Sequence, residues 1–336
     1  MSDYKSIRLE KSFYTSSKGF SAILEELDPS ENYRGTYMEG TDAFQRQLKR
    51  FDIKTAGRNS DRVEKFFSTD SSASLFPEYV RRSVAAGMEK NTILPNIVAS
   101  VTNIDSMDYR TFRTSDNPSS LELSETGEGE DLQETNIAVS SDLVHLKKRG
   151  RLLSASYEAL RFQRLDLFSV MLSQIGAYIA RTQLEDAIET LIGDDGNGDP
   201  AIVTLSTASS GTLTYSDLVH FWNSFDPYNM DTVIASPDVL EKILNLGVFN
   251  DSAAGLNFHG SGKMLTPFGA KLFKTTALGS GTLIGLDSSC ALEQVQAGGV
   301  LTEFDKLIDC QLERAAISTI TGFSKIFDGA AKMLTV

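Results

Sequence analysis

The sequence predicts an α+β protein built around one very long helix. Between residues 154 and 192, apolar residues recur at the spacing of one helix face, and no proline interrupts them. After residue 200, strand-like and helix-like segments alternate, and the tail 311–336 is rich in isoleucine and threonine, which favour strands. A long helix combined with several strands is typical of α+β folds.

Composition limits the kinds of protein that this chain can be. Its 336 residues carry 45 acidic and 32 basic side chains, a net charge of −13, which argues against a surface devoted to nucleic acid. The most apolar candidate for a membrane span, residues 168–180, is shorter than the ~20 residues that a bilayer requires, and the first residues show no secretory signal. We therefore expect no membrane partner, and free thiols at Cys290 and Cys310.

Residues 1–97 are expected to form an extended N-terminal arm. They are rich in serine, asparagine and glycine and have few apolar runs, and a short helix is predicted only at 77–88, where a proline suits the first turn. The run 44–65 is basic and is either a solvated helix face or a face turned toward DNA or an acidic partner. Its candidate contact residues are Arg46, Lys49 and Arg50.

Residues 98–113 favour strands, and an acidic segment, 114–138, follows them. Within it, leucines alternate with polar residues, and the sequence TGEG at 126–129 supplies turn chemistry, so we predict a projecting β-hairpin. Two legs of a 22-residue hairpin would reach about 36 Å at ~3.3 Å per residue, which is beyond the subunit that carries it. The acids available for contacts with another subunit are Glu122, Glu125, Glu128, Glu130, Asp131 and Glu134.

The region 139–192 contains the long helix. If continuous from Ser154 to Ile192, it would be nearly 60 Å long at ~1.5 Å per residue, and Gly193 would end it. The following region, 193–311, is expected to alternate between strands and short helices. Its predicted elements are strands at 201–207, 231–236, 271–278 and 281–286, a helix capped by Ser216, and a helix capped by Ser236 with Pro237 in its first turn.

No recognisable catalytic, cofactor or metal motif is present. The sequence lacks G-x-S-x-G and H-E-x-x-H, and its three histidines are scattered. The segment GDDGNGD at 193–199 resembles the start of a calcium loop, but Pro200 and Ser206 occupy the positions of the required glycine and glutamate. We therefore expect no enzymatic activity, no cofactor and no metal. An unrecognised hydrolase or ligand-binding protein is the alternative from a different class.

The order of the parts carries a resemblance. The stretches LFPEYVRRSVAAGMEKNTILPNI at 75–97, the strand and long helix within 139–198, and FGAKLFKTTAL at 268–278 resemble corresponding parts of the major capsid proteins of tailed bacteriophages. These proteins share the Hong Kong 97-type fold, and the resemblance covers about 75–336. It implies an N-terminal arm (1–97), peripheral-domain strands (98–113), an extended loop (114–138), a peripheral domain with a spine helix (139–192), an axial domain (193–311) and returning peripheral strands (312–336).

The resemblance also implies the partners. The chain would assemble with itself as hexamers and pentamers into an icosahedral shell around double-stranded DNA, together with a portal protein and, where present, separate scaffold and decoration proteins. Assembly would take place in the host bacterial cytoplasm, and the product is the virion. An encapsulin-type compartment is the alternative shell.

Two further expectations concern the loop. Its acids would meet basic residues of another copy, and the candidates are Lys147, Lys148 and Arg149 with Arg151, the pair Arg81 and Arg82, and the pair Arg161 and Arg164. Some members of the family crosslink their shells through a lysine of this loop. Residues 114–146 contain no lysine, so we expect no such bond here.

Overall fold

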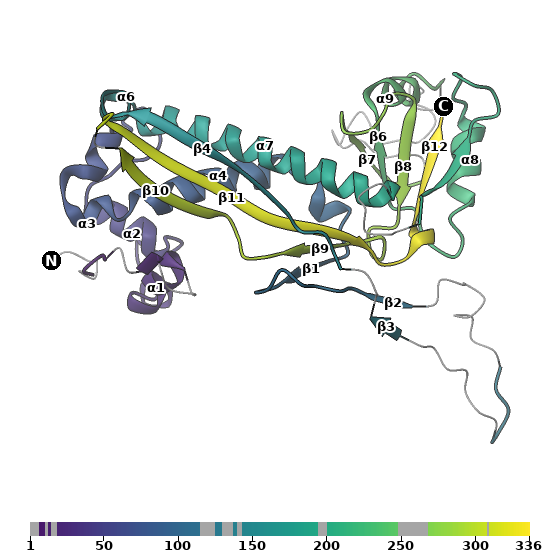
Figure 1. Ribbon diagram of the computed structural model, residues 1–336, viewed down its shortest axis with the longest axis horizontal. Helices are drawn as coiled ribbons and strands as arrows, with labels where there is room; N and C mark the ends of the chain where they lie inside the picture. Colours follow the sequence, from purple (N-terminus) through teal and green to yellow (C-terminus); the bar gives the residue numbers. More distant parts are fainter. Residues whose placement is uncertain are drawn as a thin grey trace. The chain divides into compact units, whose positions relative to one another are not determined.

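The structure is a computed structural model that describes residues 7–10, 13–14, 19–114, 125–129, 137–139, 143–193, 200–247, 268–307 and 309–336 (Figure 1). The chain forms two compact units. Unit 1 comprises residues 1–91, 149–180 and 300–319, and unit 2 comprises 92–148, 181–299 and 320–336. No helix among the described residues is both long enough and apolar enough to cross a membrane.

Unit 1 corrects the expectation of an extended arm, because residues 20–91 are largely helical. Phe20, Leu24, Phe44, Val63 and Phe66 are buried in the same core as residues of the long helix. The helices before residue 74 have at most eight residues, which is shorter than the windows of about 11–18 residues in which helical periodicity is recognised. The sequence pattern of this region was therefore interpreted as irregular. These elements are α1 Phe20–Leu27, η2 Ser30–Tyr33, α2 Ala43–Arg50, η3 Val63–Ser68, α3 Asp70–Ala73 and α4 Phe76–Asn91. The helix predicted at 77–88 corresponds to α4.

The predicted long helix begins later than expected. Gln163 has an extended conformation (φ −71°, ψ 136°), which separates α6 (Tyr157–Phe162) from α7 (Leu165–Ile192). The 28 residues of α7 span about 42 Å at ~1.5 Å per residue. The helix ends, as predicted, at Gly193, whose φ of +88° favours glycine. The expectation of a continuous helix from Ser154 was wrong because strand β4 extends to Ser156.

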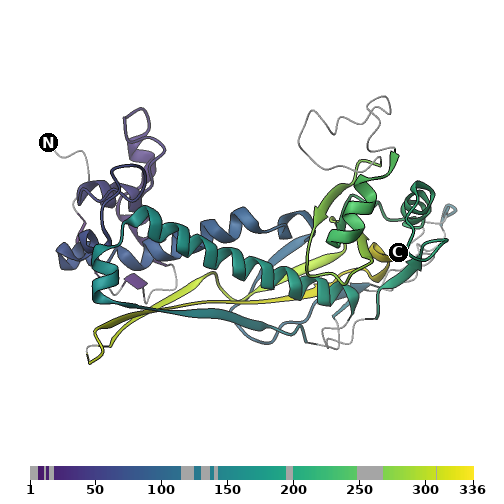
Figure 2. The same ribbon diagram turned by 90° about the horizontal axis from the view of Figure 1, so that it is seen from above.

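Helices α4 and α7 lie side by side within unit 1 (Figures 1 and 2). Their closest approach is at two glycines. A Cβ atom placed on Gly87 would overlap the carbonyl oxygen of Ser173, and one placed on Gly176 would overlap the carbonyl oxygen of Val84. Both obstacles are backbone atoms, so a side chain could not be accommodated by a rotamer change. The two backbones are therefore in direct contact at this crossing.

Two of the strands in unit 1, β4 and β11, continue into unit 2. The first half of β11 (Leu312–Lys325) pairs antiparallel with β10 (Leu301–Leu307). Strand β4 (Lys147–Ser156) also pairs with β11, and a Cβ on Gly150 would overlap the backbone of Ile317. Residues of α7, β4 and β11 thus contribute to both units.

In unit 2, the second half of β11 pairs antiparallel with β9 (Leu292–Gln296), which pairs parallel with β1 (Ser100–Asn103). A second sheet has the order β5-β12-β8-β6-β7. Its strands and the helices beside it are β5 Val203–Ser206, β6 Thr232–Ala235, β7 Lys271–Lys274, β8 Thr282–Leu286, β12 Ala331–Thr335, α8 Tyr215–Asn223 and α9 Pro237–Leu244, with η4 Leu94–Asn96 and η6 Asp328–Ala330 elsewhere in the unit.

Two predictions for this sheet need correction. The tail was expected to return as a whole to the peripheral strands, but β12 pairs with β5 and β8 of the second sheet. Helix α8 is capped by Thr214, whose side chain accepts a hydrogen bond from the amide of Asp217, and not by Ser216. Ser236 precedes Pro237 as predicted, but its side chain makes no capping bond.

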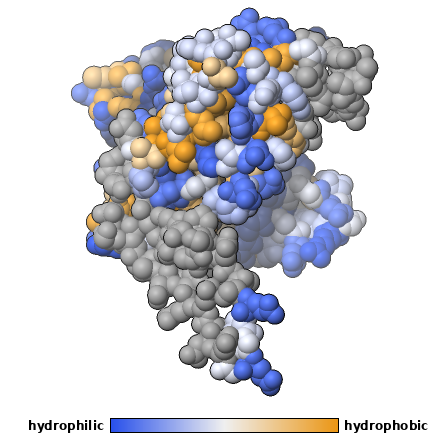
Figure 3. Space-filling view, turned by 90° about the vertical axis from the view of Figure 1, so that its right-hand side faces the viewer, coloured by the Kyte–Doolittle hydropathy of each residue, from blue (hydrophilic) through white to orange (hydrophobic). Residues whose placement is uncertain are grey.

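The second sheet is covered by a separate apolar core. Val233 of β6 and Leu283 of β8 belong to this core, and Phe221 and Phe225 pack near Gly285, where a larger residue would not fit. Figure 3 faces this end of unit 2, where hydrophobic residues lie among hydrophilic ones.

The predicted hairpin has an antiparallel base. Strand β2 (Phe112–Thr114) pairs with β3 (Ile137–Val139) in the register Thr114 to Ile137, so the connection is the segment 115–136. Of this connection the structure describes residues 125–129. A turn occurs at Glu128 and Gly129, within the predicted turn sequence, and Gly129 has a φ of +86°.

We predict that Gly87→Ala and Gly176→Ala each destabilise unit 1. Overpacking costs typically about 1–3 kcal/mol, and here the clash can be relieved only by separating two helix backbones. Gly279→Ala is the matched control, because a Cβ there meets nothing within 4 Å and its φ is not positive. Urea denaturation of the unassembled chain measures the effect, and equal stability of all three variants would contradict the crossing.

Candidate functional site

The tip of the hairpin is acidic and exposed. Glu125 and Glu128 both lie at the surface, and Gly129 closes the turn beside them. Glu122, Glu130, Asp131 and Glu134 lie outside the described residues. The described acids are accessible to a second molecule.

The basic residues that follow the hairpin, 147–149 on β4, differ in their exposure. Successive residues of a strand point to opposite faces, so Lys147 and Arg149 are half-buried while Lys148 is exposed. Lys147 Nζ lies 3.0 Å from Asp186 Oδ1 and 2.7 Å from Glu189 Oε2. Burial alone would lower the pKa of Lys147, but the hydrogen bonds to Glu189 and Asp186 outweigh it and raise that pKa. Arg149 also has contacts within its own chain.

Arg81 and Arg82 are engaged by a buried acid of the same helix. Glu78 is 1% exposed, and its carboxylate lies 2.6 Å from Arg81 Nη2 and 2.8 Å from Arg82 Nε. Burial would raise the pKa of Glu78, but the bonds from Arg81, Ser21 and Arg82 outweigh it and lower that pKa. Arg82 also pairs with Asp42, which links α4 to the cap of α2.

The third predicted basic pair is also engaged within the chain. Arg161 Nε lies 2.9 Å from Glu64 Oε1, and Arg164 Nη2 lies 2.7 Å from Asp166 Oδ2. Of the predicted partners for the loop acids, Lys148 and Arg151 are exposed on β4. The structure does not bring these residues to the hairpin tip of the same chain in any described contact.

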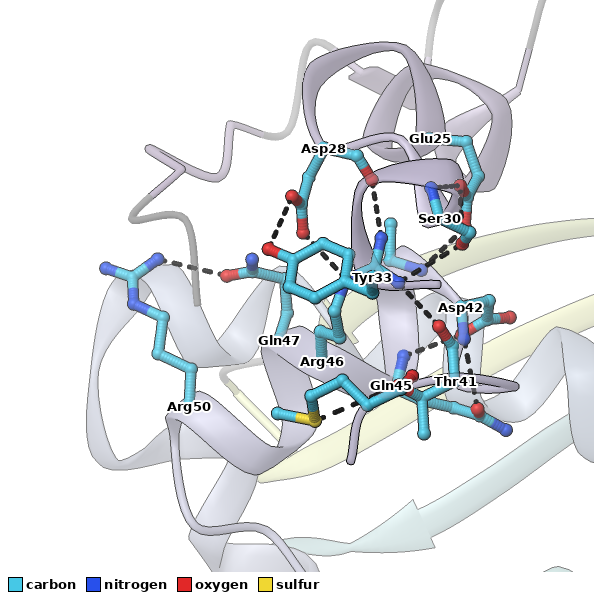
Figure 4. A network of polar contacts seen from close by, with 12 residues as sticks. Glu25, Asp28, Ser30, Tyr33, Thr41, Asp42, Gln45, Arg46, Gln47 and Arg50 are labelled. Carbon is cyan, nitrogen blue, oxygen red and sulfur yellow. Dashed lines mark hydrogen bonds and ion pairs between the residues drawn. The ribbon is translucent and has the colours of Figure 1, made fainter. Parts of the chain in front are cut away.

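Arg46 corrects the expectation that it faces DNA. It is fully buried, with Nε 2.8 Å from Asp28 Oδ2, and its guanidinium lies 4.2 Å from the ring centroid of Tyr33 (Figure 4). Its other nitrogens donate to Ser30 Oγ and to the carbonyl oxygens of Asp28 and Thr41. A buried guanidinium needs such a complete set of acceptors, so its charge is satisfied inside unit 1.

Lys49 and Arg50 differ from Arg46. Lys49 is exposed at the end of α2. Arg50 is half-buried and donates to the carbonyl oxygen of Ile7 at 2.7 Å and to Gln47 Oε1 at 3.0 Å. Of the three predicted DNA-facing residues, Lys49 is the exposed one, and its Nζ lies 3.5 Å from Met38 Sδ.

An exposed apolar face on α7 was missed by the sequence analysis. Leu167, Val170 and Met171 are 55%, 62% and 59% exposed. Met171 also lines a groove in unit 1 together with Phe168 and Phe304. Met171 belongs to the apolar period of the helix, and periodicity alone cannot distinguish a buried face from one that a second molecule covers.

Chemistry-bearing groups do not gather into a site within the described part of the chain. No three His, Cys, Asp or Glu side chains there are arranged to hold a metal ion, and residues 194–199, the calcium-like stretch, lie outside it. Cys290 and Cys310 are free thiols. Burial, followed by the charge of Asp287, raises the pKa of Cys290 to about 11, so this thiol is a weak nucleophile.

The chain matches a family of known proteins over residues 140–304, and the family is described as phage capsid protein. No curated protein sequence matches it. Among solved structures it is similar to a virus-like particle from Pyrococcus furiosus, at 13% identity and a TM-score of 0.51, covering 76% of this chain and 98% of that one.

Two phage structures are similar to the same degree. The Microbacterium phage Oxtober96 chain has 10% identity and a TM-score of 0.53, covering 73% of this chain and 91% of that one. The capsid of cyanophage P-SCSP1u has 15% identity and a TM-score of 0.53, covering 73% and 88%. At these identities the likeness shows a shared fold.

The family match and the structural likeness point to the same class of fold. The fold that the resemblance predicted is confirmed: the chain has the Hong Kong 97-type fold, and its residues 140–304 match the phage capsid protein family.

We predict that Arg46→Met destabilises unit 1 by about 3–5 kcal/mol, because it leaves Asp28 as an unpaired buried charge. Lys49→Met is the control and should change stability by no more than about 0.5 kcal/mol, since Lys49 is exposed. Urea unfolding of both variants is the measurement. An Arg46→Met chain of normal stability that packages DNA poorly would restore the DNA-facing interpretation.

Proposed function

We propose that this capsid protein assembles as hexamers and pentamers into an icosahedral shell that encloses the double-stranded DNA of a tailed phage. The observation that carries the proposal is the phage capsid family match combined with the Hong Kong 97-type fold. The role is structural and not enzymatic. One chain serves both ring sizes, so its contacts must be heterologous and close by rotation.

The surfaces of the chain support contacts with further copies. The hairpin base of β2 and β3 pairs only with itself among the described strands, and the described acids at its tip are exposed. The apolar face of α7 carries Leu167, Val170 and Met171 at the surface. Contiguous exposed apolar residues of this kind mark interaction sites, and a neighbouring copy is the occupant that a shell supplies.

The remaining partners follow from the same proposal. A portal protein would occupy one vertex, separate scaffold or decoration proteins would act where present, and the packaged DNA would be bound non-specifically. Assembly would take place in the host cytoplasm, and the virion is the final location. With a net charge of −13, the chain would meet DNA through local basic residues such as Lys49.

Particle size is the direct test. The purified full chain should form megadalton closed particles in light scattering and negative-stain electron microscopy. A compact monomer at high concentration would contradict the proposal and would favour a ligand-binding protein. Particles that contain a cargo protein in place of DNA would favour the encapsulin alternative.

We predict that Glu125→Lys with Glu128→Lys weakens assembly at low salt. Their proposed partners are Lys148 and Arg151 of another copy, and each exposed ion pair contributes about 0–1 kcal/mol, repeated over the shell. The effect should vanish near 1 M salt, where the Debye length is about 3 Å. Particle yield against salt concentration is the measurement.

The charge-neutral control is Glu125→Gln with Glu128→Gln, which should have a smaller effect. Adding Lys148→Glu and Arg151→Glu to the lysine variant should restore yield. Reversed loops that assemble normally at low salt would rule out this pairing.

A further inference from the structure

Glu293 in β9 is a buried carboxylate that accepts hydrogen bonds from three hydroxyl groups. It is 6% exposed. Tyr109 Oη donates to Glu293 Oε1 and Thr111 Oγ1 donates to Glu293 Oε2, each at 2.7 Å. Thr102 Oγ1 in β1 donates to Oε1 as well. The sequence analysis missed this residue because its donors lie more than 180 positions away.

The bonds converge on the root of the hairpin. Thr111 directly precedes β2, so its bond to Glu293 holds the point at which the outgoing limb leaves unit 2. The returning limb is tied to the same place, because the amide of Val144 donates to the carbonyl oxygen of Tyr109 at 2.9 Å. A few residues later, Lys147 bonds to Asp186 and Glu189 of α7. Both limbs are thus anchored within their own chain.

We propose that Glu293 is the positioning residue that sets the direction in which the hairpin leaves its subunit. The hairpin base has three residue pairs, and an isolated two-stranded hairpin is at best marginally stable in water. Its direction must therefore be determined by contacts at its root. The consequence for assembly rests on the proposed function, whereas the anchor itself is a property of the single chain.

Physical chemistry makes this anchor rigid. Hydrogen bonds to an ionised group are roughly twice as strong as neutral ones. A buried carboxylate left without donors would be costly, so the donors and Glu293 hold one arrangement together. At the reach of about 36 Å that the sequence predicts for the hairpin, a tilt of about 10° at the root would move the tip by about 6 Å. Such a displacement exceeds the length of a hydrogen bond or ion pair and would misplace every contact of the tip.

The test compares Thr111→Val with Thr111→Ser in the full-length chain. Valine has the same shape but lacks the hydroxyl that Glu293 accepts from, whereas serine retains it. We expect hydrogen exchange of the amides in 112–114 and 137–139 to be about tenfold faster in the valine variant and unchanged in the serine variant. Tyr109→Phe should act in the same direction, because it removes a second donor without altering β9.

A control separates positioning from general loss of stability. Ser288→Ala removes a hydroxyl that donates to Asp231 in the same unit, in a contact that does not involve the hairpin root. It should leave exchange in 112–114 and 137–139 unchanged. The anchor is wrong if Thr111→Val leaves this exchange unaltered, or if Ser288→Ala raises it equally.

Electron microscopy of the same variants gives the second readout. Thr111→Val should produce fewer or malformed particles than Thr111→Ser, even where the two unassembled chains unfold at the same urea concentration. Normal particles from a valine variant with faster exchange would overturn the role of the anchor in assembly. Failure of the unaltered chain to form particles would instead refute the proposed function and leave the exchange result standing.

Discussion

The close crossing of α4 and α7 is the constraint on which unit 1 depends. Gly87 and Gly176 allow the backbones of the two helices to touch. This contact fixes the position of one helix along the other, and so it determines which apolar side chains meet beside the crossing. Phe76 of α4 stacks on Phe168 of α7 as a result, with ring centroids 6.0 Å apart. The N-terminal helices are joined to α4 in turn through Glu78 and its arginines. Residues 20–74 are therefore part of the folded unit and not a free arm.

The distribution of charge explains how an acidic chain can both fold and assemble. Several of the arginines and lysines predicted to contact other molecules are paired with acids of their own chain. Arg46 is fully buried and needs such an acceptor, whereas Arg81 and Lys147 form their ion pairs while partly exposed. Among the predicted contact residues that the structure describes, Glu125 and Glu128 on the hairpin, Lys148 and Arg151 on β4, and Lys49 on α2 are exposed. Exposed pairs are weak individually, so the proposed contacts between copies would each be reversible.

The likeness to capsid structures at 10–15% identity shows which properties this fold retains. The long helix, the sheets and the projecting hairpin depend on patterns of apolar spacing and turn residues, which many sequences satisfy. The contacts that orient these parts, such as the carboxylate of Glu293 at the hairpin root, depend on individual side chains. The proposed role depends on how these elements are oriented. The contacts that fix their orientation are therefore more important for it than any reactive side chain.

The sequence alone determined the elements whose signals are local. The apolar period of 168–191, the stop at Gly193, the buried strand β6 and the hairpin with its turn near Gly129 were all predicted, because propensity and turn chemistry act over a few residues. Tertiary structure decided what depends on distant partners: the burial of Arg46 against Asp28, the break at Gln163, and the placement of β12 in the second sheet. From the sequence alone, a charged residue is expected to be exposed, because its buried acceptor comes from a distant segment. A strand likewise does not specify which strands it pairs with, because pairing depends on packing between segments far apart in the chain.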